Sequence, residues 1–189
     1  WQLSDPPWQP DADLLAFLEA GSKPVFIGFG SMIAPDSAAL TRTVIEAVER
    51  SGQRAILSGG WGDLGAQDLP PTMRRIEYVP YRWLFSRMAA VIHHGGSGTT
   101  GLALSSGVPS MVVAFGTEQL YWGGRIAVLS VGLPPLFVKR LDTETLAERI
   151  RALVSDDGMR ERAAALGARL RTEDGIGAAV GVVRGVVGS

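Results

Sequence analysis

The sequence contains no cysteine, and this absence excludes several kinds of chemistry. The chain can form no disulfide, offers no thiol nucleophile and lacks the ligand that most structural zinc sites use. Its only histidines are the adjacent pair His93 and His94. Because neighbouring strand residues point to opposite faces and no third ligand is near in the sequence, we expect no metal site at this pair.

An excess of charge of either sign is also missing. The 18 basic and 19 acidic side chains leave a formal net charge of −1. A chain without a broad basic field is poorly suited to nucleic acid, so we expect no nucleic-acid partner. No apolar run approaches the roughly 20 residues that cross a bilayer, which leaves at most a peripheral membrane association. Residues 1–7 lack the basic end and apolar core of a secretory signal, so we expect a cytoplasmic location.

Short apolar runs alternate with helical patterns along most of the 189 residues, a length typical of one domain. The predicted strands are residues 25–29, 54–57, 75–79, 90–93, 108–114 and 136–138. The predicted helices are residues 11–19, 36–51, 83–88, 97–106, 118–130, 143–154 and 157–171. Fully apolar strands that alternate with helices predict an α/β fold, a Rossmann-like parallel sheet with helices on both faces.

Three parts of the chain differ in composition. Residues 1–20 are interpreted as a linker with a short helix, 21–173 as the main α/β domain, and 174–189 as a helical tail. The pair Asp11 and Asp13 resembles a metal-binding acidic triplet, but a cap at the start of the first helix explains it better. Glycines at four-residue spacing in the tail, Gly177, Gly181 and Gly185, favour close packing against a neighbouring domain.

The most informative segment is residues 91–100, which read VIHHGGSGTT. An apolar strand leads into two histidines, a glycine-rich turn and a helix start rich in hydroxyls. We expect Ser97 to cap this helix, which would leave the amides of Gly98, Thr99 and Thr100 as unpaired donors. The helix dipole adds positive potential at the same place. The segment therefore predicts a phosphate or diphosphate site that needs no cationic side chain.

Two common phosphate-binding motifs fit this chain poorly. A P-loop requires a lysine beside its glycines, whereas the only lysines are Lys23 and Lys139. The dinucleotide fingerprint requires a third glycine, and Ile33 occupies that position in the segment GFGSMI. The next strand ends near Ser58 and not in the acidic residue that would bind a ribose. An NAD-binding module therefore remains a weak alternative.

Taken in order, the segments GFGSM (28–32), YVPYRWLF (78–85), HHGGSGTT (93–100), GVP (107–109) and EQ (118–119) resemble a known donor signature. They are similar to the C-terminal, nucleotide-sugar-binding domain of GT-B glycosyltransferases in the UDP-glycosyltransferase superfamily. That superfamily includes antibiotic, macrolide and sterol glycosyltransferases. The resemblance extends from about residue 22 to residue 155. It implies inverting transfer from a UDP- or dTDP-sugar to a hydroxyl of a macrolide, sterol or other small molecule, without a metal or cofactor.

The resemblance also implies a role for individual residues. The diphosphate would be bound by Ser31, His94, Gly96, Gly98 and Thr99. The base would lie against Tyr78 and pair with the backbone of Val79. The sugar hydroxyls would be bound by Glu118 and Gln119. A carboxylate accepts strongly from hydroxyls and an amide both donates and accepts, so this last pair suits a sugar.

The chain departs from the family pattern at several points. Many members have a ribose-binding glutamate where this chain has Leu102, which weakens the case for a strict uridine donor and leaves a dTDP-sugar open. Tyr81 and Arg82 replace a usual His-Asp pair. Whole family enzymes carry an N-terminal acceptor domain with the catalytic base, and we expect no catalytic residue in this chain. The partner would be such an acceptor domain or subunit, and this chain alone would be inactive. The alternative is a non-catalytic donor-binding subunit of a two-chain glycosyltransferase.

Overall fold

A computed structural model describes residues 7–60, 64 and 68–187. Its strands are β1 (Val25–Gly28), β2 (Ala55–Ser58), β3 (Met73–Ile76), β4 (Ala90–His93), β5 (Ser110–Ala114) and β6 (Leu136–Phe137). Its α-helices are α1 (Ala12–Glu19), α2 (Ser37–Ser51), α3 (Tyr81–Phe85), α4 (Ser97–Ser106), α5 (Thr117–Val128), α6 (Thr143–Ser155), α7 (Asp157–Leu170) and α8 (Gly175–Val187). A single 3-10 turn, Val138–Arg140, follows β6.

The six strands form one parallel sheet in the order β3-β2-β1-β4-β5-β6. The central strand β1 pairs on one side with β2, at Val25 and Ala55, and on the other with β4, at Val25 and Ala90. The chain therefore builds the sheet outward from β1 in one direction and then returns to build it in the other. In open α/β sheets, ligands bind beyond the carboxyl ends of the strands at this reversal. The predicted Rossmann-like parallel sheet is confirmed.

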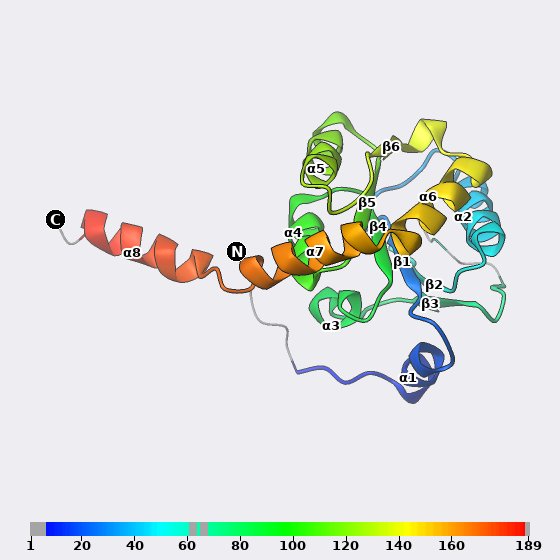
Figure 1. Ribbon diagram of the computed structural model, residues 1–189, viewed down its shortest axis with the longest axis horizontal. Coiled ribbons are helices and arrows are strands. Elements are labelled where there is room, and N and C mark those ends of the chain that lie inside the picture. Colours follow the sequence, from blue (N-terminus) through cyan, green and yellow to red (C-terminus); the bar gives the residue numbers. More distant parts are fainter. Residues whose placement is uncertain (1–6, 61–63, 65–67, 188–189) are drawn as a thin grey trace.

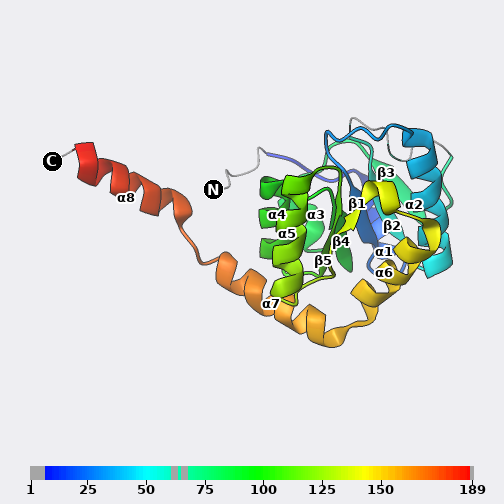
Figure 2. The same ribbon diagram turned by 90° about the horizontal axis from the view of Figure 1, so that it is seen from above.

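Helices cover both faces of this sheet, as the fully apolar strands predicted. Figure 2 shows α3, α4 and α5 on one side and α2 and α6 on the other. Alternate strand residues divide between the two layers: Val25 and Ile27 pack toward α2 and α6, and Phe26 packs toward α3. The α2 and α6 layer includes Val44, Ala47, Val48, Leu146, Ala147, Ile150 and Leu153. Because both layers are dry and apolar, the polar groups that can bind a ligand are confined to the strand ends and loops.

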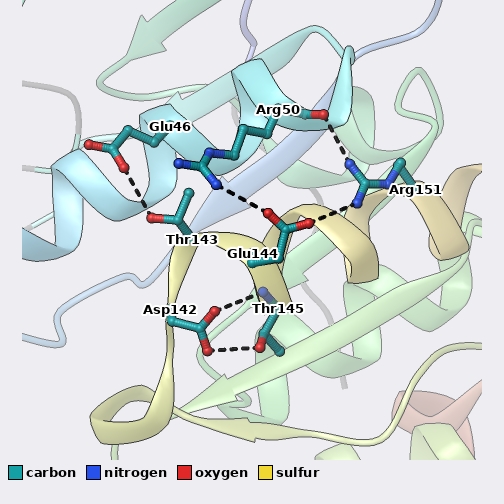
Figure 3. A network of polar contacts seen from close by, with 7 residues as sticks. All are labelled: Glu46, Arg50, Asp142, Thr143, Glu144, Thr145 and Arg151. Atoms are coloured by element: carbon teal, nitrogen blue, oxygen red, sulfur yellow. Dashed lines mark hydrogen bonds and ion pairs between the residues drawn. The ribbon is translucent and has the colours of Figure 1, made fainter.

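A polar network also joins α2 to α6 above their apolar contact (Figure 3). Glu144 accepts from Arg50 at 3.1 Å and from Arg151 at 3.4 Å. Thr143 donates to Glu46 at 3.1 Å, and Arg151 also donates to the Arg50 carbonyl at 2.9 Å. Since these side chains are largely exposed, each ion pair contributes at most about 1 kcal/mol. The network favours one orientation of the two helices, whereas burial of their apolar side chains stabilises the contact between them.

Two predicted boundaries are wrong around the third strand. The strand covers Met73–Ile76 and not residues 75–79, and the next helix covers Tyr81–Phe85 and not residues 83–88. The reason is Pro80, which lies at the N-cap with a φ of −57° and whose carbonyl accepts from Trp83 and Leu84. Proline is pre-organised for a helix start, so the helix begins directly after it. Tyr78 consequently lies in the connecting loop.

The predicted tail helix is present as α8, which extends away from the domain in Figures 1 and 2. None of its residues is buried, and its apolar side chains, such as Val182 and Val186, are exposed. The expected packing of its glycines against a neighbouring domain stays a prediction. Within residues 7–60, 64 and 68–187, no helix combines the length and apolar character needed to cross a membrane.

The predicted first helix is part of the domain and not of a separate linker. Leu14 of α1 is only 1% exposed and belongs to the layer that contains Phe26. Asp11 caps this helix by accepting from the Leu14 amide at 2.6 Å. The interpretation of the acidic pair as a helix cap is confirmed.

Candidate functional site

The loops that follow β1 and β4 meet at the carboxyl edge of the sheet, at the point where the strand order reverses. The ring of His94 lies between them. A Cβ atom placed on Gly30 would lie 3.1 Å from Cε1 of His94, and one placed on Gly96 would lie 2.5 Å from its Nε2. Gly30 also has a φ of +59°, which favours glycine. Two glycines therefore create the space in which the half-buried His94 ring is held.

The predicted cap of α4 is wrong by one residue. The N-cap is Gly96 and not Ser97, because both the amide and the hydroxyl of Thr100 donate to the Gly96 carbonyl at 2.9 Å. The Thr100 amide is therefore already paired. The amides of Ser97, Gly98 and Thr99 precede this first helical hydrogen bond. They replace the expected set of donors. They include Gly98 and Thr99, whereas Gly96, which was also predicted to bind the diphosphate, is the N-cap itself.

The start of α4 differs from the start of four other helices. In α1, α2, α6 and α7, an aspartate at the N-cap accepts from the amide three residues on: Asp11, Asp36, Asp142 and Asp156. These carboxylates satisfy a first-turn amide and compensate the positive end of the helix dipole. In α4 the N-cap is a glycine and no side chain caps the helix. An external anion is the natural partner for its first-turn amides.

The two histidines have different environments, as their alternation along the strand predicted. His93 is fully buried, and its Nδ1 accepts from the Gly95 amide at 3.1 Å. Burial, with a smaller contribution from the charge of a protonated His94, lowers the pKa of His93 to about 3. Among the described residues, its buried Nε2 has no hydrogen-bond partner. An unpaired N–H in the core costs about 1–3 kcal/mol. The ring is thus neutral, and the fold contains it in spite of this cost.

Burial also lowers the pKa of His94, so this ring is neutral at pH 7. Its Nδ1 is buried without a partner in the described part of the chain. The Nε2 edge lies over Gly96, beside the first turn of α4. A neutral imidazole can donate one hydrogen bond to a phosphate oxygen, and an anion placed here would raise the pKa and favour the charged form.

Gln119 has a structural role that the sequence did not indicate. Its Oε1 accepts from the amides of Phe115 at 2.6 Å and Gly116 at 3.2 Å. Its Nε2 lies 3.2 Å from Sδ of Met32 and donates to it. The side chain therefore caps α5 and ties the loop after β5 to the loop after β1. A contact with a sugar would have to come from the remaining proton on Nε2, whereas the neighbouring Glu118 is exposed.

The other predicted site residues occupy two places along the same edge. Ser31 is exposed in the loop after β1, directly after Gly30, whose backbone lies against the His94 ring. Tyr78 is 64% exposed and Val79 only 8% exposed, beyond the edge strand β3. In the strand order, β2 and β1 lie between β3, which leads to this loop, and β4, which leads to His94. The roles of Tyr78 and Val79 in base binding stay predictions.

The residue after Pro80 is part of the packed layer. The ring of Tyr81 stacks on Phe85 with centroids 4.6 Å apart and packs edge-on against Phe26 at 5.1 Å. Its hydroxyl lies 3.3 Å from Oγ of Ser58 at the end of β2. Within the described residues, no three histidine, aspartate or glutamate side chains gather in a way that would hold a metal ion.

Comparison with known proteins identifies the family of this chain. The family described as erythromycin biosynthesis protein CIII-like, C-terminal domain, matches residues 61–174. The chain belongs to this family. It is also 40% identical over 193 residues to a sterol 3-beta-glucosyltransferase of Aspergillus terreus, an alignment that covers 95% of this chain and 14% of that protein. A sterol 3-beta-glucosyltransferase of Arabidopsis thaliana is 37% identical over 174 residues, which cover 92% of this chain and 27% of the relative.

Solved structures agree with this family membership. The calicheamicin glycosyltransferase CalG4 matches with a TM-score of 0.77 at 22% identity, over 98% of this chain and 45% of that one. SnogD of Streptomyces nogalater matches with a TM-score of 0.63 at 28% identity, over 90% of this chain and 42% of that one. The fold is that of the C-terminal half of a GT-B glycosyltransferase. The chain therefore spans under half of these structures and under a third of the two curated relatives.

Proposed function

We propose that this family member binds the nucleotide-sugar donor of a GT-B glycosyltransferase, with the diphosphate at the start of α4. The observation that carries the proposal is the uncapped first turn of α4 beside the ring of His94, at the reversal of strand order between β1 and β4. Amides, a helix dipole and a neutral imidazole together suit a diphosphate. They do so without a cationic side chain, which explains how a chain of net charge −1 can bind a polyanion.

We assign the diphosphate to the amides of Gly96, Gly98 and Thr99, the His94 ring and the hydroxyls of Ser31 and Thr99. The base would extend toward Tyr78 and Val79, in the loop that follows β3 of the same sheet. The exposed Glu118 would accept from sugar hydroxyls, with Gln119 contributing through Nε2. Leu102 offers no acceptor for a ribose hydroxyl, so we propose both UDP- and dTDP-sugars as candidate donors.

In the intact enzyme, we propose metal-independent transfer with inversion. An acceptor hydroxyl attacks the anomeric carbon, the C–O bond to the diphosphate breaks, and its electron pair passes to the leaving diphosphate. A base outside this chain takes the hydroxyl proton. The role of this domain is to orient the sugar and to stabilise the charge that develops on the leaving diphosphate, through the α4 amides and His94.

The identity with two sterol 3-beta-glucosyltransferases supports glucose as the sugar and a sterol or similar polycyclic alcohol as the acceptor. The acceptor would be selected by another part of a longer protein or by a partner subunit. This chain alone would then bind a donor without transferring it.

The proposal is tested by isothermal titration of the chain with UDP, dTDP, their glucose conjugates and NAD, with and without EDTA. We expect binding of at least one nucleoside diphosphate and of its sugar conjugate, no measurable binding of NAD, and no effect of EDTA. Tight binding of NAD without binding of either diphosphate would refute the proposal. A loss of affinity in EDTA would refute its metal-independent form.

A further inference from the structure

We propose that His93, which contacts no part of the proposed ligand site directly, is a positioning residue that sets the geometry of the diphosphate loop. The inference rests on the proposed function, because the affinity that it concerns is that for a nucleoside diphosphate. It differs from the role of His94, whose ring would touch the phosphate itself.

The hydrogen bond between His93 and Gly95 spans His94. His93 Nδ1 accepts from the Gly95 amide at 3.1 Å, so the two bonded residues lie on either side of His94. The bond closes a small loop of backbone that includes His94. The direction in which the His94 side chain leaves the strand, and therefore the place of its ring over Gly96, depends on this loop.

The second step is the confinement of Gly95 on its other side. Its φ is +90°, and it is buried. A Cβ atom placed on it would lie 2.8 Å from Cγ1 of Val112 in β5 and 3.0 Å from Cβ of Gln119 in α5. The chain therefore passes through a slot between β4, β5 and α5 with its amide directed at the His93 ring. The next residue, Gly96, caps α4.

The third step concerns the state of the ring. Only an unprotonated Nδ1 can accept from an amide, so the proton of the neutral ring must be on Nε2. Full burial keeps His93 neutral through the physiological range. The Nε2 proton has no partner among the residues that the structure describes, so the ring gains nothing there. Among the described residues, the hydrogen bond from the Gly95 amide is the one that the His93 ring makes, and this bond shapes the loop.

Two substitutions separate this role from simple core packing. His93→Asn places Oδ1 where Nδ1 now lies, at the same number of bonds from the backbone, and keeps an acceptor for Gly95. His93→Leu has a similar volume but no acceptor. In the leucine variant, the unpaired Gly95 amide replaces the unpaired Nε2 proton, and these two costs are of similar size. We therefore expect His93→Leu to fold.

The experiment measures the UDP and dTDP affinities of the chain and both variants by titration calorimetry, with thermal unfolding in parallel. We expect His93→Asn to bind within about threefold of the unchanged chain and His93→Leu to bind at least about tenfold more weakly. Equal affinities in all three would overturn the inference and leave the proposed function intact. Equal losses in both variants would also overturn it, since core packing alone would then account for the effect. A chain that binds neither diphosphate overturns both proposals.

A second measurement does not depend on whether His93→Leu folds, because it uses the unchanged chain. Nitrogen-15 NMR of the unchanged chain reports which ring nitrogen carries the proton. We expect Nε2 to be protonated and Nδ1 to be bare from pH 7 to pH 5, with a Gly95 amide that exchanges slowly with solvent. A protonated Nδ1, or fast exchange of the Gly95 amide, would overturn the inference.

Discussion

The imidazole of His94 lies against the backbone of Gly30, so that a Cβ atom on Gly30 would stand 3.1 Å from Cε1 of the ring. These two residues follow different strands, β4 and β1, on the two sides of the strand-order reversal. The contact makes the loop after β1 one wall of the proposed diphosphate site. A substitution at Gly30 should therefore change the affinity for the ligand, even though glycine has no side chain that could contact it.

The first prediction compares Gly30→Ala with Gly52→Ala. Both glycines have a positive φ, +59° and +69°, but a Cβ atom on Gly52 would meet nothing within 4 Å. Each alanine should cost about 1 kcal/mol of unfolding free energy from backbone strain. Only Gly30→Ala should also displace His94 and weaken UDP or dTDP binding, by about tenfold in calorimetry. Equal affinities in the two variants would show that the ring position does not matter to the ligand.

The second prediction uses the open space around Gly98. A Cβ atom there would meet no protein atom within 4 Å, and the same is true of Gly181 in α8. Alanine is the better helix former, so both Gly98→Ala and Gly181→Ala should hold or raise the unfolding free energy, by up to about 1 kcal/mol. At Gly98 the added methyl group would obstruct a phosphate that contacts the backbone. We expect nucleotide affinity to fall in Gly98→Ala alone; unchanged affinity there would place the phosphate elsewhere.

The third prediction separates the two roles of Gln119. Gln119→Leu leaves the amides of Phe115 and Gly116 without their acceptor and should lower the unfolding free energy by about 1–2 kcal/mol. Gln119→Glu keeps an acceptor and should lose less. Glu118→Gln, at an exposed position, should change stability by less than about 0.5 kcal/mol but reduce the preference for UDP-glucose over UDP. Denaturant unfolding and calorimetry measure these effects, and an equally stable Gln119→Leu would contradict the capping role.

The fourth prediction concerns pH. Because burial lowers the pKa of His93 from 6.5 to about 3, the unfolded chain binds a proton that the folded chain does not. Stability is then complete above pH 6.5 and is lost as the pH falls, by about 2 kcal/mol between pH 8 and pH 5. His94, whose pKa burial also lowers, acts in the same direction. Denaturant unfolding across this range checks it, and the decrease should become smaller in His93→Leu. An unchanged decrease in that variant would assign the effect to other groups.

Asp142 titrates outside this pH window. The pKa of Asp142 is lowered, chiefly by the hydrogen bond from the Thr145 amide, so it loses its charge only below its ordinary range. Its contribution to stability is present throughout pH 5 to pH 8 and disappears in more acidic solution. Measurements that stop at pH 5 therefore leave the contribution of Asp142 unchanged.

The sequence predicted the parallel sheet and the helix start after β4 because both depend on local patterns. Apolar strands, a glycine-rich turn and a helix start are encoded in adjacent residues. The N-cap was misplaced by one residue because Ser97 is a good capping residue by type, whereas the choice of Gly96 depends on the bonds that Thr100 makes. Local propensity cannot weigh one such arrangement against the other.

Sequence patterns did not predict the contacts between loops. The position of His94 between Gly30 and Gly96, and the bond from Gln119 to Met32, join residues that follow different strands. Their proximity follows from the strand order, which a single sequence does not specify. Gln119 was assigned to the sugar by resemblance, and only the structure shows that its oxygen caps α5. The interpretation of Glu118, which is exposed, stays a prediction.

The central claim is that the start of α4 and His94 bind the diphosphate of a nucleotide-sugar. The most direct test is a calorimetric titration of the chain and of His94→Ala with UDP and dTDP, with thermal unfolding as a check of the fold. The account predicts saturable binding by the unchanged chain and at least about tenfold weaker binding by a His94→Ala variant that unfolds at a similar temperature. Equal nucleotide affinity in the two proteins would contradict it.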